Sequence, residues 1–162
     1  MIYLGIDPGI ARCGYGLIEE HRDGSLTSIA YGVIETPKIE SLPERLLALY
    51  EALRALLDRF QPDEVAVEEL FFAKNITNAI PVAHARGAVL LTLQQRGLRV
   101  AEYTPMEVKQ AVSGYGGADK KQMQEMVRML LNLEKIPRPD DAADALAVAV
   151  THASSRRMAG LR

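Results

Sequence analysis

The fold is decided by Ile2-Tyr3-Leu4-Gly5-Ile6-Asp7-Pro8-Gly9, an almost continuously apolar run that stops at an aspartate. A strand buried on both faces has this unbroken apolar character, whereas a strand with one wet face alternates. Pro8 and Gly9 cannot extend the strand and instead predict a turn. The run therefore predicts a central strand that delivers Asp7 to one edge of a sheet.

The rest of the chain alternates strand and helix patterns around this strand. Two short connections join the first three strands, which predicts an antiparallel meander. A right-handed crossover from the third strand then places the fourth beside the first and parallel to it, which gives an α/β protein with a five-stranded mixed sheet in the order 3-2-1-4-5, flanked by helices. Strands are expected at residues 2–7, 13–19, 26–35, 64–70 and 98–103, and helices at about residues 42–60, 75–96, 105–112, 119–131 and 140–158.

This topology is expected to bring acidic residues together at one edge of the sheet, where they predict a metal site. Glu68 ends the apolar run Val65-Ala66-Val67, so it is expected beside Asp7 at the carboxyl edge of two parallel strands, where open α/β sheets bind ligands. Asp141 and Asp144 stand one turn apart on the last helix and share a face. Buried acids are costly unless a cation neutralises them, and an oxygen-only site favours Mg²⁺ or Mn²⁺ over Zn²⁺.

Simpler explanations exist for single acids and for the histidines. Asp140 is a plausible N-cap of the last helix, and Asp141 could serve only the helix dipole. The three histidines lack ligand spacing and are expected on the surface or satisfied in the core, although His152 lies two turns beyond Asp144 and could approach the site. Asp144 is harder to explain away, because its neighbours are small or apolar.

Composition limits the broad class of the protein. The 162 residues suit one domain, expected at 1–158 with a short tail at 159–162. The single cysteine, Cys13, cannot form an internal disulfide, is expected to be buried and suits a reducing cytoplasm. A net charge of −2 gives no global nucleic-acid signature, but lysines and an arginine cluster between residues 109 and 128.

Several short motifs carry a resemblance to a known family. They are Gly5-Ile6-Asp7-Pro8-Gly9, Val65-Ala66-Val67-Glu68, Ala73-Lys74-Asn75, Ala85-Arg86-Gly87, Val108-Lys109-Gln110 and Asp141-Ala142-Ala143-Asp144-Ala145-Leu146-Ala147. In this order, from residue 2 to about 153, the chain resembles the RuvC Holliday-junction resolvases of bacteria. The resemblance implies a ribonuclease-H-like fold, a homodimer and metal-dependent cleavage of four-way DNA junctions, with RuvA and RuvB as possible partners.

The same resemblance assigns roles to residues. The family's catalytic acids fall on Asp7, Glu68, Asp141 and Asp144, which would bind two Mg²⁺ or Mn²⁺ ions and cut DNA to 5′-phosphate and 3′-hydroxyl ends. Some members of the family carry histidine where this chain has Asp141. Residues expected to contact DNA are Phe71, Lys109 and Lys120, with Lys121, Arg86 and Lys74 as weaker candidates.

Three alternatives remain at this point. Actin-like nucleotide-binding proteins also place Asp-x-Gly after their first strand, but they need a duplicated domain that 162 residues cannot hold. Another ribonuclease-H-like nuclease would keep the fold and metals and cut RNA or other branched nucleic acid. A catalytically inactive junction-binding module would not need all four acids.

The small-residue helix around Ala79–Gly87 is either a dimer face or the surface that packs on its own sheet.

Overall fold

The computed structural model of the chain describes residues 1–69 and 76–160. Its five strands form one sheet in the order β3-β2-β1-β4-β5, which confirms the predicted order and the mixed α/β class. β1 is antiparallel to β2 and parallel to β4. The strands are β1 (Ile2–Asp7), β2 (Arg12–Glu20), β3 (Leu26–Glu35), β4 (Glu64–Glu68) and β5 (Val100–Tyr103).

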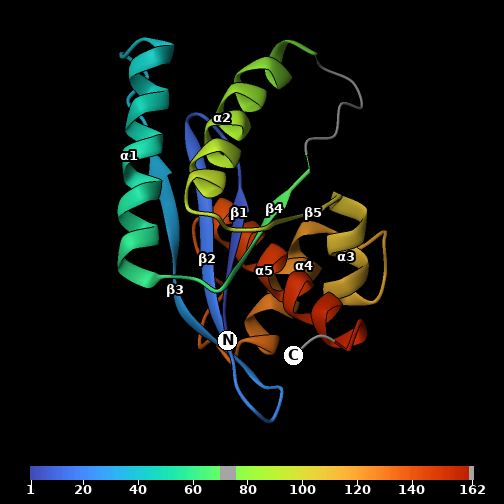
Figure 1. Cartoon of the computed structure of the whole chain (residues 1–162). Coiled ribbons are helices and arrows are strands. Elements are labelled where there is room, and N and C mark those ends of the chain that lie inside the picture. The colour runs from blue at the N-terminus through green and yellow to red at the C-terminus, as the bar shows by residue number, and fades with distance from the viewer. Residues whose placement is uncertain (70–75, 161–162) are drawn as a thin grey trace.

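Helices cover both faces of this sheet (Figure 1). They are α1 (Leu42–Phe60), α2 (Ile76–Gln95), α3 (Pro105–Ser113), α4 (Lys120–Leu130) and α5 (Asp140–Met158). Side chains alternate along β1, so that Leu4 and Ile6 join the core beneath α1 and α2, whereas Tyr3 joins the core beneath α3, α4 and α5. The central strand is therefore buried on both faces, as its composition predicts.

The register of the central strands sets the place of the first two acids. Gly5 pairs with Ala66 and Ile6 with Val67 across the parallel β1–β4 ladder. The next residues along these strands are Asp7 and Glu68, so both leave the sheet side by side at the same edge.

Glycines let α5 lie directly on the sheet. A Cβ atom at Gly5 would overlap the carbonyl oxygen of Ala145, and one at Gly14 would overlap that of Asp141. Larger residues at either position would push the helix outward. This close contact fixes the first turns of α5, which carry Asp141 and Asp144, over the end of β1.

A few predicted details differ from the structure. Pro139 is the N-cap of α5 and Asp140 is its first helical residue, so the predicted Asp140 cap is wrong by one position. Asp119 caps α4 instead of lying within it, since its side chain accepts a hydrogen bond from the backbone N–H of Gln122. Cys13 is buried as expected. Among the helices of the described residues, none is long and apolar enough to cross a membrane.

Candidate active site

Asp7 and Glu68 form a half-buried pair of carboxyl groups joined by a hydrogen bond. Burial, followed by repulsion from Glu68 and Asp144, raises the pKa of Asp7 to about 9. Burial also raises the pKa of Glu68, although Lys109 lowers it in part. The two acids share a proton because water screens their mutual repulsion poorly at this position, so both cannot ionise easily.

α5 brings two further acids to this pair. The pKa of Asp144 is raised, first by burial, while Lys120 opposes the rise and Asp141 adds to it. Asp141 is more exposed, with 34% of its side chain accessible, and one of its carboxylate oxygens lies 4.0 Å from the guanidinium of Arg12. Asp7, Glu68 and Asp144 are thus close enough to affect one another, and Asp141 lies at the margin.

Glu68 stands between two adjoining pockets. One, of about 210 Å³, is lined by Asp7, Glu68 and Arg86 among others. The second, of about 260 Å³, is lined by Glu68 and Asp144 together with Lys109 and Lys120. Acidic walls at the centre and lysines on one side suit a ligand that carries phosphate and needs a cation.

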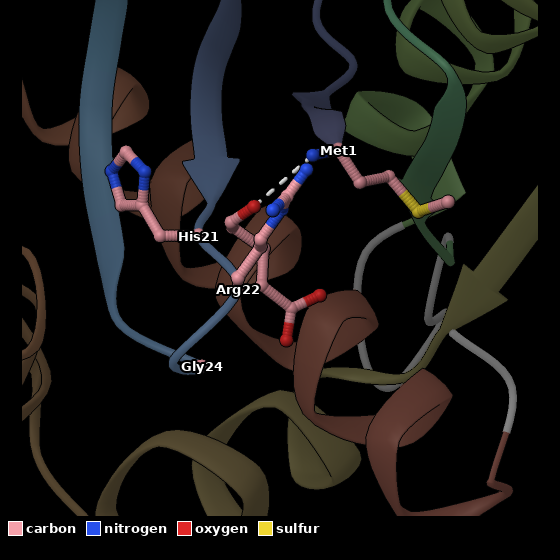
Figure 2. A pocket seen from close by; sticks show the side chains of 5 residues that line it. Met1, His21, Arg22 and Gly24 are labelled. Atoms are coloured by element: carbon pink, nitrogen blue, oxygen red, sulfur yellow. Dashed lines mark hydrogen bonds between the residues drawn. The ribbon is translucent and has the colours of Figure 1, made fainter.

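A larger pocket, of about 400 Å³, lies at the opposite edge of the sheet. Figure 2 shows it around Met1, whose amino group donates to the carbonyl oxygen of Glu20, and around the β2–β3 turn. None of the four acids lines it, so its size does not make it the candidate active site.

The acids fit a divalent metal by their chemistry, but they are not gathered into a finished cluster. Across residues 1–69 and 76–160, no three Asp, Glu, His or Cys side chains lie close enough together to hold one ion. The oxygen-only donor set and the raised pKa values of Asp7, Glu68 and Asp144 nevertheless indicate a site that a hard cation would stabilise. The complete set of four metal ligands remains a prediction.

The predicted DNA-binding residues fall into three groups. Lys109 and Lys120 line the second pocket, beside Glu68 and Asp144. Lys121 is exposed on α4, whereas Arg86 is half-buried and forms an ion pair with Glu102. Phe71 and Lys74 lie outside the described residues.

Two functional-site neighbours were not predicted from sequence. Arg12, at the start of β2, reaches both Glu35, at 3.3 Å, and Asp141. Asp140 accepts from Lys120 at 3.0 Å, which raises the pKa of that lysine. Asp140 also binds Arg138 and Gln124. The Arg12–Asp141 and Lys120–Asp140 pairs join segments that are distant in the sequence, so no local pattern predicts them.

His152 is a satisfied core residue, which was the favoured interpretation. It is buried and lies 2.8 Å from a carboxylate oxygen of Glu64, at the start of β4, and 2.9 Å from the hydroxyl of Tyr103. Glu64 and Glu68 are the two ends of β4, so His152 faces the other edge of the sheet. It does not join the acids.

The family model named Crossover junction endodeoxyribonuclease RuvC matches residues 3–152. The chain belongs to the RuvC family. It is 59% identical to the RuvC protein of Chloroflexus aurantiacus over 150 residues, which covers 93% of this chain and 91% of the relative. It is also 57% identical to that of Desulfitobacterium hafniense over 155 residues, covering 96% and 93% of the two chains.

Solved structures agree with this assignment. The RuvC of Thermus thermophilus in complex with a Holliday junction substrate has a TM-score of 0.92 and 40% identity, covering 98% of this chain and 96% of that one. The yeast mitochondrial Holliday junction resolvase Ydc2, at 16% identity and a TM-score of 0.69, shares the fold. The architecture is therefore that of RuvC, which is ribonuclease-H-like, as the resemblance implied.

Proposed function

We propose that this chain is a Holliday-junction-resolving endonuclease that places paired, symmetric nicks in four-way DNA junctions. The observation that carries the proposal is the meeting of Asp7, Glu68 and Asp144 at one sheet edge, beside Lys109 and Lys120, in a chain of the RuvC family. As a member of this family the chain acts on phosphodiester bonds as a metal-dependent nuclease.

The four acids would divide the work of holding two Mg²⁺ or Mn²⁺ ions. Asp7 stands at the end of the central strand and is hydrogen-bonded to Glu68, so these two would contribute ligands together. Glu68 on one side, and Asp144 with Asp141 on the other, would complete the ligand set. Ions bound there would supply an activated water and stabilise the leaving oxygen, consistent with 5′-phosphate and 3′-hydroxyl products.

The basic residues would hold the junction strands. Lys109 and Lys120 line the pocket that contains Glu68 and Asp144, so each can bind a phosphate near the cut. Lys121, which is exposed on α4, and Arg86, which lines the pocket of Asp7 and Glu68 but is paired with Glu102, are weaker candidates. Phe71 and Lys74 are proposed from the family resemblance alone, as are contacts with RuvA and RuvB.

A second copy of the chain would supply the second cut. α2 packs on the sheet through Ala85, Val89 and Leu93, while Ile80 and Leu91 on its other side are 55% and 59% exposed. This exposed apolar surface is continuous with small residues such as Gly87, which has nothing within 4 Å of a Cβ atom built on it. We assign it to a homodimer of the 1–158 nuclease domain, because two equivalent sites related by a twofold axis give symmetric nicks.

The test is a cleavage assay on a synthetic four-way junction with each strand labelled. We expect paired nicks that require Mg²⁺ or Mn²⁺, and we expect Asp7→Asn to abolish cutting while junction binding persists. Equal cutting of linear duplex would argue against junction specificity. Preferential cutting of an RNA-containing substrate would favour the alternative of a ribonuclease-H-like enzyme that acts on RNA.

A further inference from the structure

The loop between α3 and α4 carries an exposed aromatic residue, Tyr115. Its side chain is 65% exposed, so its ring can be reached from solvent. The backbone beneath it is well tied down, because the N–H of Tyr115 donates to the hydroxyl of Ser113 at 3.2 Å. The carbonyl oxygen of Tyr115 also accepts from the N–H of Ala118 at 3.2 Å.

The ring itself lies over a glycine. A Cβ atom at Gly117 would come within 2.6 Å of the Tyr115 hydroxyl oxygen and 2.7 Å of the ring carbon that bears it, so only glycine leaves room for the ring in this position. The neighbouring Gly116 lies against Met106, whose side chain is 70% exposed. One side of the ring is therefore supported by backbone, and the other is free to contact a ligand.

The loop adjoins the candidate active site. Ala118, within the loop, and Lys120, the first residue of α4, line the same pocket as Glu68 and Asp144. Lys109 lines that pocket from α3, one turn before the loop begins. A strand whose phosphates bind Lys109 and Lys120 would thus pass close to the exposed ring of Tyr115.

We propose that Tyr115 stacks on an unpaired base of the junction strand that Lys109 and Lys120 hold, within a few nucleotides of the cut. This rests on the proposed function and adds a residue that positions the substrate. A nucleic acid strand fits the surface better than a protein partner, because lysines and an aromatic ring together form the usual single-strand platform of phosphate contacts and base stacking.

The experiment places the fluorescent base 2-aminopurine at successive positions around the branch point of the junction. Fluorescence and affinity are measured without metal, and single-turnover cleavage is measured with Mg²⁺. Tyr115→Ala should restore the fluorescence that the wild type quenches at one position, and should weaken junction binding roughly tenfold, within the range found for loss of one stacked base. Tyr115→Phe should behave like the wild type, because stacking needs the ring and not the hydroxyl.

Gly117→Ala is a second test, in which the tyrosine itself is not substituted. Its methyl group should displace the ring and reduce quenching at the same position, with a smaller loss of affinity. Wild-type quenching and affinity in Tyr115→Ala, or an equal loss in Tyr115→Phe, would overturn the proposal. Failure of the wild type itself to cut the junction would instead overturn the proposed function.

Discussion

Asp7→Asn is expected to stabilise the metal-free protein while it abolishes cleavage. Burial and the nearby carboxylates raise the pKa of Asp7 from its ordinary 3.8 to about 9, so the folded protein keeps this acid protonated at neutral pH, whereas the unfolded chain ionises it. A raised pKa favours the folded state below pH 3.8, and this advantage is lost as the pH rises toward 9. Asparagine does not ionise, and its amide can still donate to Glu68.

The size of the effect follows from the same shift. At pH 7 the solution is about three pH units above the ordinary pKa of an aspartate, and at about 1.4 kcal/mol per unit the cost is slightly more than 4 kcal/mol. Relaxation of the site reduces this value, so we expect a gain of about 2 kcal/mol, or about 4–8 °C in melting temperature for a domain of this size.

Thermal and urea unfolding in EDTA at pH 5, 7 and 9 measure the effect. Asp7→Asn should be the more stable protein at pH 7, with a smaller difference at pH 5 and a larger one at pH 9. Added Mg²⁺ should stabilise the wild type through binding and stabilise the variant less. A variant no more stable than the wild type in EDTA, or a difference that does not vary with pH, would refute the reasoning.

Asp140→Asn is the matched control. Asp140 is also an acid near the site, but its hydrogen bond and ion pair with Lys120 lower its pKa. The sign is therefore reversed, and removing its charge should give no stabilisation at pH 7. Stabilisation by both variants would mean that net negative charge, and not the buried position of Asp7, is responsible.

Three further predictions concern other parts of the fold. Gly14→Ala should lift the first turn of α5 from β2 because its methyl group would overlap the carbonyl oxygen of Asp141, costing about 1–3 kcal/mol in urea unfolding and roughly 10²-fold in single-turnover cleavage, with metal-free junction binding retained. Burial lowers the pKa of His152, so its contribution to stability is lost as the pH falls below its ordinary 6.5, and His152→Gln should reduce the difference in urea midpoint between pH 7.5 and 5.5. Leu91→Arg should shift the protein toward monomer in light scattering, so that each junction is nicked in one strand instead of two. Leu47→Arg, at an exposed position on α1, should change neither result.

The sequence predicted the centre of the site better than its surroundings. The unbroken apolar run of β1 fixes a central strand, and the handedness of the crossover then places Glu68 beside Asp7. The charge partners of the remaining acids could not be predicted in this way. Arg12 meets Asp141 only because β2 packs under α5, and Asp140 turns toward Lys120 because α4 lies beside the start of α5. Such contacts depend on packing distances that no local pattern encodes.

Lys120 can pair with Asp140 or with a DNA phosphate, and exchanging one for the other should cost little free energy. Without DNA it holds Asp140 at 3.0 Å in a pair whose side chains are 58% and 42% exposed. Exposed ion pairs of this kind are worth about 1 kcal/mol or less, so a phosphate can compete for the lysine. Asp140 is not left alone when Lys120 moves, because Arg138 binds the same carboxylate at 2.8 Å. We therefore expect Asp140 to hold Lys120 near Asp144 until a DNA strand binds, a role that requires no metal contact from Asp140.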